Sequence, residues 1–264
     1  MSEKFPVYSI AKPFLTQTVL ELGLPLTDRI GQHLSEISEP YADRRIDKLL
    51  NHTSGLADYS ALAAYGQAVD ERTDAWSREE LLDRCGALNH SIDGFNYSNI
   101  GFLLLRMMLE EKTGLSMFGA IKSLVLDALA IDGFQEWEDR SDIVPGYDPR
   151  WVYSGTFLAD AESIKRGFVK LVRHRAETIG LDAGMTLLPY QGTGFDHPGY
   201  SYGFMNDVDL ATGQPECVGH GGGGPGFSHM ILVNTANWQV GLETSTADFD
   251  QAAAITRLRA ATSN

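Results

Sequence analysis

The sequence predicts an α+β protein in which a largely helical middle is followed by antiparallel strands. Before Tyr200, apolar residues recur with the spacing of helices. After Tyr200, the sequence changes to short β-rich and aromatic runs that Gly, Pro and Asn interrupt. Because no repeat, low-complexity tract or linker separates the two parts, we expect one domain over residues 1–264. Its α/β lobe would comprise 1–30 and 195–264, and its mainly helical lobe 31–194.

Caps and apolar spacing mark the helices. An extended FPVYS segment leads into a helix over Ile10–Leu22, which Gly23 ends. A second helix begins after Ser98 or Asn99, either of which can cap it, and its apolar residues on nearly every face indicate burial. Further helices are expected over about 116–130 and 161–175, with helices and loops over 60–95. A polar helical stretch is expected ahead of IDKLLNHTSGLADY.

The strands are predicted in YSYGFMNDVD, CVGHGGG, FSHMILVNTA and WQVGLETST, because short runs with turn residues between them suit successive antiparallel strands. The tail, DFDQAAAITRLRAAT, returns to helix with Asp at its start.

Composition excludes several classes of partner. The formal net charge of −14 repels phosphate backbones and anionic lipid head groups, so neither nucleic acid nor membrane is an expected partner. No apolar run reaches membrane-spanning length. The start, MSEKFPVYSIAKPF, lacks the features of a secretory signal, which predicts a cytoplasmic location. The two cysteines are interpreted as ordinary thiols.

Ser9 and Lys12 are the first candidates for chemistry. A hydroxyl needs a base within hydrogen-bond reach to act as a nucleophile. Ser9 and Lys12 are three residues apart, so they share one face if Ser9 opens the helix. A lysine serves as a base only when burial or nearby cations lower its pKa. Chance supplies roughly half such a match in a chain of this composition, and the competing interpretation is a surface serine that caps the helix.

Two further motifs carry candidate residues. Tyr97 and Asn99 lie on a loop before the buried helix, where a phenol can relay a proton and an amide can hold a lysine and a substrate carbonyl. The alternative is a core aromatic beside a capping Asn. His220, Gly221, Gly222 and Gly223 end a strand, where glycines let a substrate lie against the strand edge and an N–H can complete an oxyanion hole. The alternative is a flexible glycine turn.

Other interpretations of these motifs fail on physical grounds. A nucleotide-binding glycine loop must open a helix, but strand residues follow Gly226. The G-x-S-x-G elbow of α/β-hydrolases is absent because Met230 stands where its last glycine would be. The histidines form no HExxH and no tight pairing with carboxylates. We therefore expect no metal and no cofactor.

Taken together and in order, SIAK, LLNHTSGLADY, YSNIGFLLLRMMLEEKTG and GHGGGGPGFSHMILV resemble the serine β-lactamase and penicillin-binding-protein superfamily, in its class C-like branch. The resemblance covers nearly the whole chain. It implies an antiparallel sheet flanked by helices, a helical lobe, and an active site in the groove between them. It also implies roles: Ser9 as the acylated nucleophile, Lys12 as its base, Tyr97 as the proton relay toward the leaving group, Asn99 as a partner of Lys12 and the substrate amide, His220 at the strand edge, and the N–H groups of Ser9 and Gly223 as the oxyanion hole. His52 falls in a structural turn and receives no catalytic role.

The sequence departs from that family pattern at two places. Members that act as β-lactamases or transpeptidases usually carry a lysine where His220 stands, and a mostly neutral histidine is a weaker partner for a substrate carboxylate. A helix and two strands precede the family's serine, whereas eight residues do here. Either the start is truncated or the sheet lacks these strands. In the second case we expect an exposed apolar edge around Trp238–Thr246, which pairs with a second copy in a homodimer or is covered by some substitute.

The function expected from the sequence is a serine hydrolase that forms an acyl-enzyme from a small ester or amide. Esterase, amidase and D-amino-acid peptidase activities fit His220 better than β-lactamase activity does. The alternative is a catalytically silent member of the family that serves as a binding or assembly module, which the shortened start favours.

Overall fold

The computed structural model describes residues 3–86, 94–137, 139 and 143–263. The helices are α1 (Ala11–Glu21), α2 (Ile46–Leu50), α3 (Ala63–Asp70), α4 (Arg78–Gly86), α5 (Asn99–Thr113), α6 (Met117–Ile121), α7 (Ala161–Thr178) and α8 (Gln251–Thr262). The strands are β1 (Phe5–Pro6), β2 (Gln135–Glu136), β3 (Phe157–Ala159), β4 (Thr186–Leu187), β5 (Pro198–Ser201), β6 (Phe204–Val208), β7 (Pro215–Gly224), β8 (Phe227–Asn234) and β9 (Val240–Ser245).

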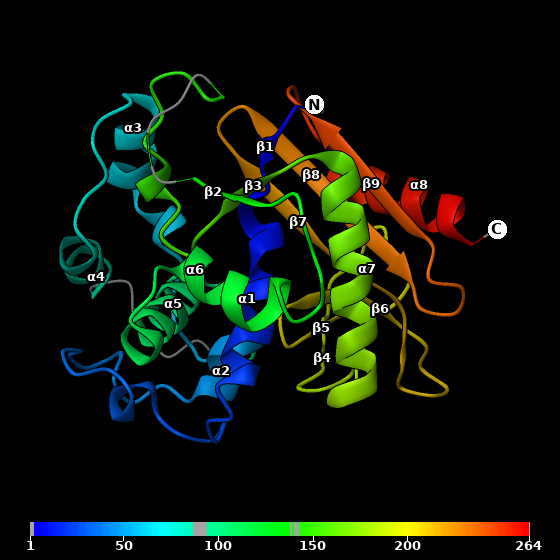
Figure 1. Ribbon diagram of the computed structural model, residues 1–264, viewed down its shortest axis with the longest axis horizontal. Helices are drawn as coiled ribbons and strands as arrows, with labels where there is room; N and C mark the ends of the chain where they lie inside the picture. The colour runs from blue at the N-terminus through cyan, green and yellow to red at the C-terminus, as the bar shows by residue number, and fades with distance from the viewer. Residues whose placement is uncertain (1–2, 87–93, 138, 140–142, 264) are drawn as a thin grey trace.

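The main sheet has six strands in the order β4-β5-β6-β7-β8-β9, and every neighbouring pair is antiparallel. A second, small sheet has the order β1-β3-β2. Helices α3 to α6 lie to one side of α1, and the main sheet with α7 and α8 lies to the other (Figure 1). The expected α+β architecture is confirmed, with the expected strands after Tyr200 present as β5 to β9.

Helices cover both faces of the main sheet because side chains alternate along its strands. On β8, Ile231 and Val233 belong to the large core cluster that contains α1 and α7 residues. Met230 and Leu232 belong to a smaller cluster with residues of α8. The sheet is therefore a middle layer, with α7 in front of it and α8 behind it in Figure 1.

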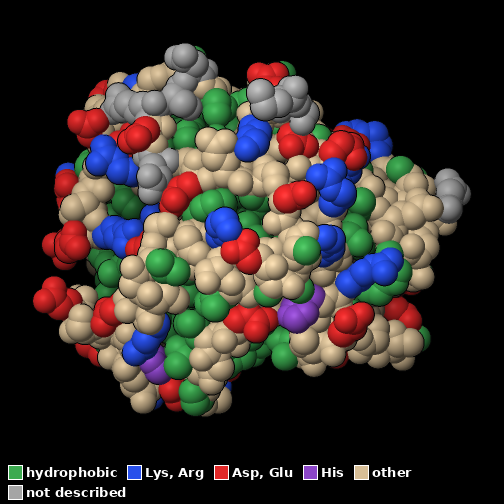
Figure 2. Space-filling model, in the orientation of Figure 1, with side chains coloured by type: hydrophobic (Ala, Val, Ile, Leu, Met, Phe, Trp, Pro, Cys, Tyr) green, Lys and Arg blue, Asp and Glu red, His purple; other side chains and the backbone are tan. Residues whose placement is uncertain are grey.

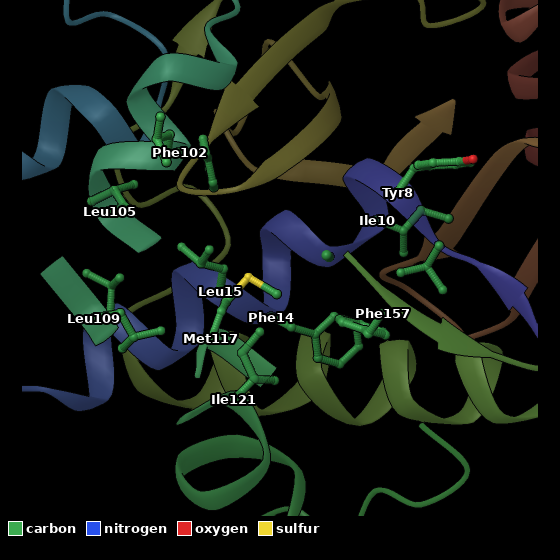
Figure 3. Packing of buried hydrophobic residues seen from close by; sticks show 14 of the residues in the cluster. Tyr8, Ile10, Phe14, Leu15, Phe102, Leu105, Leu109, Met117, Ile121 and Phe157 are labelled. Carbon is green, nitrogen blue, oxygen red and sulfur yellow. The ribbon is translucent and has the colours of Figure 1, made fainter. Parts of the chain in front are cut away.

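Helix α1 runs through the centre of the molecule. Leu15 and Phe14 are fully buried, and the Phe14 ring packs edge-on against Phe157 of β3 at a centroid distance of 5.6 Å. Figure 3 shows this packing, with Met117 and Ile121 of α6 beside α1. The predicted helix over 10–22 is confirmed, and Gly23 follows it with φ +65°. A central α1 gives the residues at its start a rigid position.

Helix α5 is the second buried helix and confirms the prediction for the segment after Tyr97. The Ser98 side chain accepts a hydrogen bond from the backbone N–H of Gly101 at 3.2 Å, so Ser98 is the cap. Gly114 ends the helix with φ +68°. Because α5 contacts both α1 and α2, its first residues are held close to the start of α1.

The polar helical stretch expected ahead of residue 46 is wrong. Only Ile30–Gln32 form a short 3₁₀ helix there, and an isolated bridge pairs Arg29 with Arg45. Its apolar residues Ile30, Leu34 and Tyr41 are buried although the segment is not helical. Turns and backbone bonds such as Ile46 N–H to the Asp28 carbonyl organise it instead. The helix expected over 116–130 divides into α6 and a wider turn over Lys122–Leu126.

The lobe boundaries stay a prediction. β3 and α7 lie within the segment assigned to the helical lobe, yet β3 contacts β1, and α7 contacts the strands β8 and β9.

β9 is the edge strand of the main sheet as far as the structure describes the chain. Part of the predicted 60–95 region, residues 87–93, lies outside the described residues.

None of the helices in the described ranges combines the length and the apolar character needed to span a bilayer. On the face drawn in Figure 2, Lys and Arg side chains are interspersed with Asp and Glu.

Candidate active site

Ser9 lies in a single 3₁₀ turn, Tyr8–Ile10, that leads directly into α1. Lys12 is the second residue of α1, and its Nζ is 2.9 Å from Ser9 Oγ. The two side chains therefore share one face at the entrance of the helix, as their spacing predicts.

The residue before Ser9 has an unusual backbone. Tyr8 has φ +47°, in the left-handed region that L-residues seldom adopt. Two contacts hold it there: its backbone N–H donates to Thr156 Oγ1 at 2.9 Å, and its hydroxyl donates to the Pro225 carbonyl at 2.5 Å. This turn presents the Ser9 side chain toward the cavity beside β7.

Lys12 is almost completely enclosed, with 1% of its surface exposed. Besides Ser9, its Nζ contacts Asn99 Oδ1 at 2.7 Å and Ser154 Oγ at 3.3 Å, and it lies 5.2 Å from the centre of the Tyr97 ring. Burial lowers the pKa of Lys12 from 10.5 to about 7, and the more distant charge of Asp58 opposes this change. A substantial fraction of the amine is therefore uncharged near neutral pH.

Asp58 is a neighbour of this site that sequence reasoning did not single out. Asn99 Nδ2 donates to Asp58 Oδ2 at 2.9 Å, which fixes the Asn99 amide with its oxygen toward Lys12. Burial raises the pKa of Asp58, whereas hydrogen bonds from Ser60 and the charge of Lys12 lower it. Asp58 stands in the quoted segment LLNHTSGLADY, but its spacing carries no signal of a contact with α5.

Tyr97 is also brought to the site. Its pKa is raised by burial, and a hydrogen bond with the Ser9 side chain opposes that rise. Its ring lies against His52, with centroids 4.1 Å apart. The phenol is therefore protonated at neutral pH and adjacent to Ser9, as a proton donor must be.

Strand β7 carries the glycines, and the space around Gly221 and Gly222 leaves no room for a side chain. A Cβ on Gly222 would overlap the carbonyl oxygen of Val7, just before the Ser9 turn. A Cβ on Gly221 would meet the side chain of Gln251 at the start of α8. Gly223 pairs with Ser228 of β8, and a Cβ there would meet little. β7 thus packs closely against the turn that holds Ser9.

His220 lies on β7 with 1% of its surface exposed, and it ends a chain of buried hydrogen bonds. The Ser98 N–H donates to His52 Nδ1 at 3.1 Å, and His52 Nε2 lies 3.2 Å from the Tyr200 hydroxyl. That hydroxyl lies 3.1 Å from His220 Nε2, and His220 Nδ1 lies 2.6 Å from the Gly221 carbonyl.

The fixed ends of this chain determine its protons. The Ser98 N–H can only donate and the Gly221 carbonyl can only accept, so His52 carries its proton on Nε2 and His220 on Nδ1. Tyr200 then accepts from His52 and donates to His220. Burial, and to a smaller extent the charge of Lys12, lowers the pKa of His220 to about 3. Burial also holds the pKa of His52 well below its usual range.

Two cavities meet at Ser9. The larger, about 610 Å³, lies between β7, the start of α8 and the segments around Phe95 and Tyr190, and it includes Tyr97 and His220. The smaller, about 250 Å³, has Asn99, Ser154 and four tyrosine rings on its walls. Among the residues that the structure describes, no group of three or more His, Cys, Asp or Glu could hold a metal ion.

The candidate residues from the sequence lie close together around Ser9. Ser9, Lys12, Tyr97 and Asn99 are linked by the contacts above, and His220 and Gly221–Gly223 line the same cavity as Ser9. Sequence reasoning missed Asp58, Ser154 and Tyr200. It treated His52 as part of a structural turn, and the structure adds its contact with Tyr200.

Known proteins resemble this chain in sequence and in fold. A family model described as Beta-lactamase matches residues 2–262. Penicillin-binding protein 4* of Bacillus subtilis (strain 168) is 30% identical over 129 residues, which make up 46% of this chain and 28% of that protein, so the match spans less than a third of the relative. A D-stereospecific amidohydrolase from Streptomyces sp. has a similar structure, with a TM-score of 0.78 and 22% identity, over 97% of this chain and 86% of the other. The octameric penicillin-binding protein homologue from Pyrococcus abyssi gives a TM-score of 0.72 and 20% identity, over 97% of this chain and 64% of the other. The chain belongs to the Beta-lactamase family.

Proposed function

We propose that this protein is a serine hydrolase that forms an acyl-enzyme from a small ester or amide. The observation that carries the proposal is the buried Lys12 amine, 2.9 Å from Ser9 Oγ and with a pKa near 7. An uncharged amine at that distance can take the hydroxyl proton, which an ordinary surface lysine cannot do at neutral pH. The likeness to a D-stereospecific amidohydrolase favours an amide among these substrates.

The reaction follows from the positions of the groups. Lys12 accepts the Ser9 proton while Ser9 Oγ bonds to the substrate carbonyl carbon, and the N–H groups of Ser9 and Gly223 hold the resulting oxyanion. The carbon–leaving-group bond then breaks, and Tyr97 gives its proton to the leaving group and regains one from Lys12. Water then takes the role of the nucleophile: it loses a proton to Lys12 and bonds to the acyl carbon. Tyr97 gives its proton to Ser9 Oγ as the bond to Ser9 breaks, which releases the acid and restores Ser9.

Asn99 and Asp58 act through Lys12 in this proposal. Asn99 holds the Lys12 amine toward Ser9, and Asp58 fixes the Asn99 amide. The hydrogen bonds that run from His52 through Tyr200 keep His220 neutral. The site therefore offers no cation at the position where β-lactamases usually carry a lysine. We therefore propose esterase, amidase or D-amino-acid peptidase activity ahead of β-lactam hydrolysis.

A covalent label tests the proposal. The protein is incubated with a fluorophosphonate at pH 8 and digested, and the peptide that carries Ser9 is weighed. We expect the mass of one phosphonyl group on Ser9, no label in Ser9→Ala, and labelling at least 100-fold slower in Lys12→Ala, since general-base assistance contributes roughly 10²–10⁴-fold.

The control is Ser35→Ala, which removes an exposed serine outside the site and should label like the parent. Absence of label on the folded parent protein at any pH from 6 to 9 would remove the enzyme proposal and favour the catalytically silent alternative.

A further inference from the structure

The larger cavity beside Ser9 is lined by neutral and mainly apolar side chains. Its walls include Phe95, Tyr190, Phe195, Met205 and Phe249. No Asp, Glu, Lys or Arg stands among the described residues that line it. A charged group bound in this cavity would therefore lose water and find no counter-ion there.

His220 does not supply the missing charge. Its Nδ1–H is already donated to the Gly221 carbonyl, and its Nε2 accepts from Tyr200. Protonation of His220 would add an N–H at Nε2, which faces the Tyr200 hydroxyl. The Tyr200 proton would then lose Nε2 as its acceptor. The fixed hydrogen bonds thus keep His220 an uncharged wall of the cavity, with both ring nitrogens in use.

The positions of Tyr97 and Asn99 indicate which part of the substrate enters which cavity. Tyr97, the proposed proton donor to the leaving group, lines the larger cavity and not the smaller one. Asn99 lines the smaller cavity and not the larger one. Since a proton donor must reach the departing atom, the leaving group belongs on the Tyr97 side and the acyl group on the Asn99 side.

From this placement we infer that the leaving group is uncharged and carries an apolar group about the size of an aromatic ring, which occupies the cavity between β7 and the start of α8. The cavity is large enough for such a group, and the aromatic walls match it. Leaving groups that end in a carboxylate, as in a peptide with a free C-terminus, are selected against. This inference rests on the proposed serine hydrolase function.

Two esters that differ only in charge test it. 4-Acetoxybenzamide and 4-acetoxybenzoate have leaving groups of nearly the same shape and give the same acetyl-enzyme. The two kcat/KM values, each divided by the ester's rate with hydroxide in buffer, report the charge preference alone. We expect the neutral ester to be favoured at least 10-fold. Equal values, or a preference for the carboxylate, would overturn the inference.

A variant adds a cation to the cavity wall. Gln251 is exposed at the start of α8, and its side chain lies against Gly221. In Gln251→Arg we expect the carboxylate ester to gain at least fivefold in kcat/KM relative to the neutral ester. Gln251→Met, which changes shape without charge, should leave the ratio of the two esters as in the parent.

Ser9 labelling separates the possible failures. If Gln251→Arg labels at the parent rate and the ester ratio stays unchanged, the leaving group does not occupy this cavity and the inference is wrong, while the hydrolase proposal survives. If neither ester acetylates Ser9 by mass and the fluorophosphonate also fails, the proposed function itself is wrong. Should Gln251→Arg fail to fold, the same comparison is made with Ala252→Lys on the same wall.

Discussion

Replacing Lys12 with methionine should abolish activity and yet make the protein more stable at pH 7. Methionine keeps the length and apolar stem of lysine but has no charge to desolvate. In the parent, folding transfers an amine with an ordinary pKa of 10.5 to a site where its pKa is about 7. At pH 7 this difference opposes folding by about 4 kcal/mol.

The gain from methionine is smaller than that figure because hydrogen bonds are lost. Lys12 contacts Ser9, Asn99 and Ser154, and each bond contributes about 1 kcal/mol. The net increase expected in the free energy of unfolding is therefore about 1–2 kcal/mol at pH 7.

The pH dependence is the sharper observable, because the hydrogen-bond losses do not change between pH 7 and 9. Lys12 has a lowered pKa in the folded state, so between pH 7 and 10.5 the unfolded chain binds more protons than the folded one. The stability of the parent relative to Lys12→Met therefore rises with pH in this window, by about 2 kcal/mol from pH 7 to 9. Below pH 7 the lysine is protonated in both states and the difference levels off.

The assay is urea unfolding of the parent and Lys12→Met at pH 7 and 9, followed by circular dichroism. Lys48→Met is the control, because the exposed Lys48 meets water in both states and its replacement should have the same effect at both pH values. If the difference between parent and Lys12→Met is the same at pH 7 and 9, Lys12 is charged in the folded protein throughout, and the base proposed here does not exist.

Four further predictions follow from the site and the sheet. The kcat/KM for a neutral ester should rise with pH through about 7, because only the uncharged Lys12 amine accepts a proton, and a flat profile from pH 5 to 9 would argue against it. Gly222→Ala should lower the free energy of unfolding by about 1–3 kcal/mol in urea, since its Cβ overlaps the Val7 carbonyl; unchanged stability would show that the strand can move away. Tyr200→Phe should lower the free energy of unfolding by about 1–3 kcal/mol in the same assay, because it leaves nitrogens of two buried histidines without their hydroxyl partner. An unchanged free energy would argue against the hydrogen bonds from His52 through Tyr200 to His220. We also propose that two copies pair along β9, so light scattering should give the mass of a dimer; a monomer whose β9 amides exchange rapidly would exclude this pairing.

The parts of the fold that follow local rules could be predicted from the sequence. The apolar spacing of α1, the Ser98 cap of α5 and Gly114 at its end are signals within a few residues of the element they define. The small sheet was not predicted, because strands of two or three residues carry no periodicity and β1 pairs with residues 158 and 159, far away along the chain. The segment over 26–45 was misassigned because polar composition alone does not distinguish a helix from turns.

The site divides in the same way. Ser9 and Lys12 meet because a helix brings residues three apart together, so spacing alone predicts their contact. Tyr97, Asn99 and His220 could be added only because their motifs occur in the order of a known family. Ser154 and Tyr200 stand in segments without a motif, and tertiary packing alone brings them to Lys12 and His220.

The left-handed Tyr8 links the nucleophile to a distant turn. A tyrosine in this conformation carries about 1–3 kcal/mol of backbone strain, and one of the two bonds that hold it ends on the Pro225 carbonyl, at the turn between β7 and β8. A rearranged hairpin tip would remove one of the two hydrogen bonds that hold Tyr8 in this conformation, and we expect this loss to shift Ser9 relative to Lys12. Gly224 and Pro225 also line the smaller cavity, so substitutions around residues 224–226 should change turnover and the selectivity for the acyl group together.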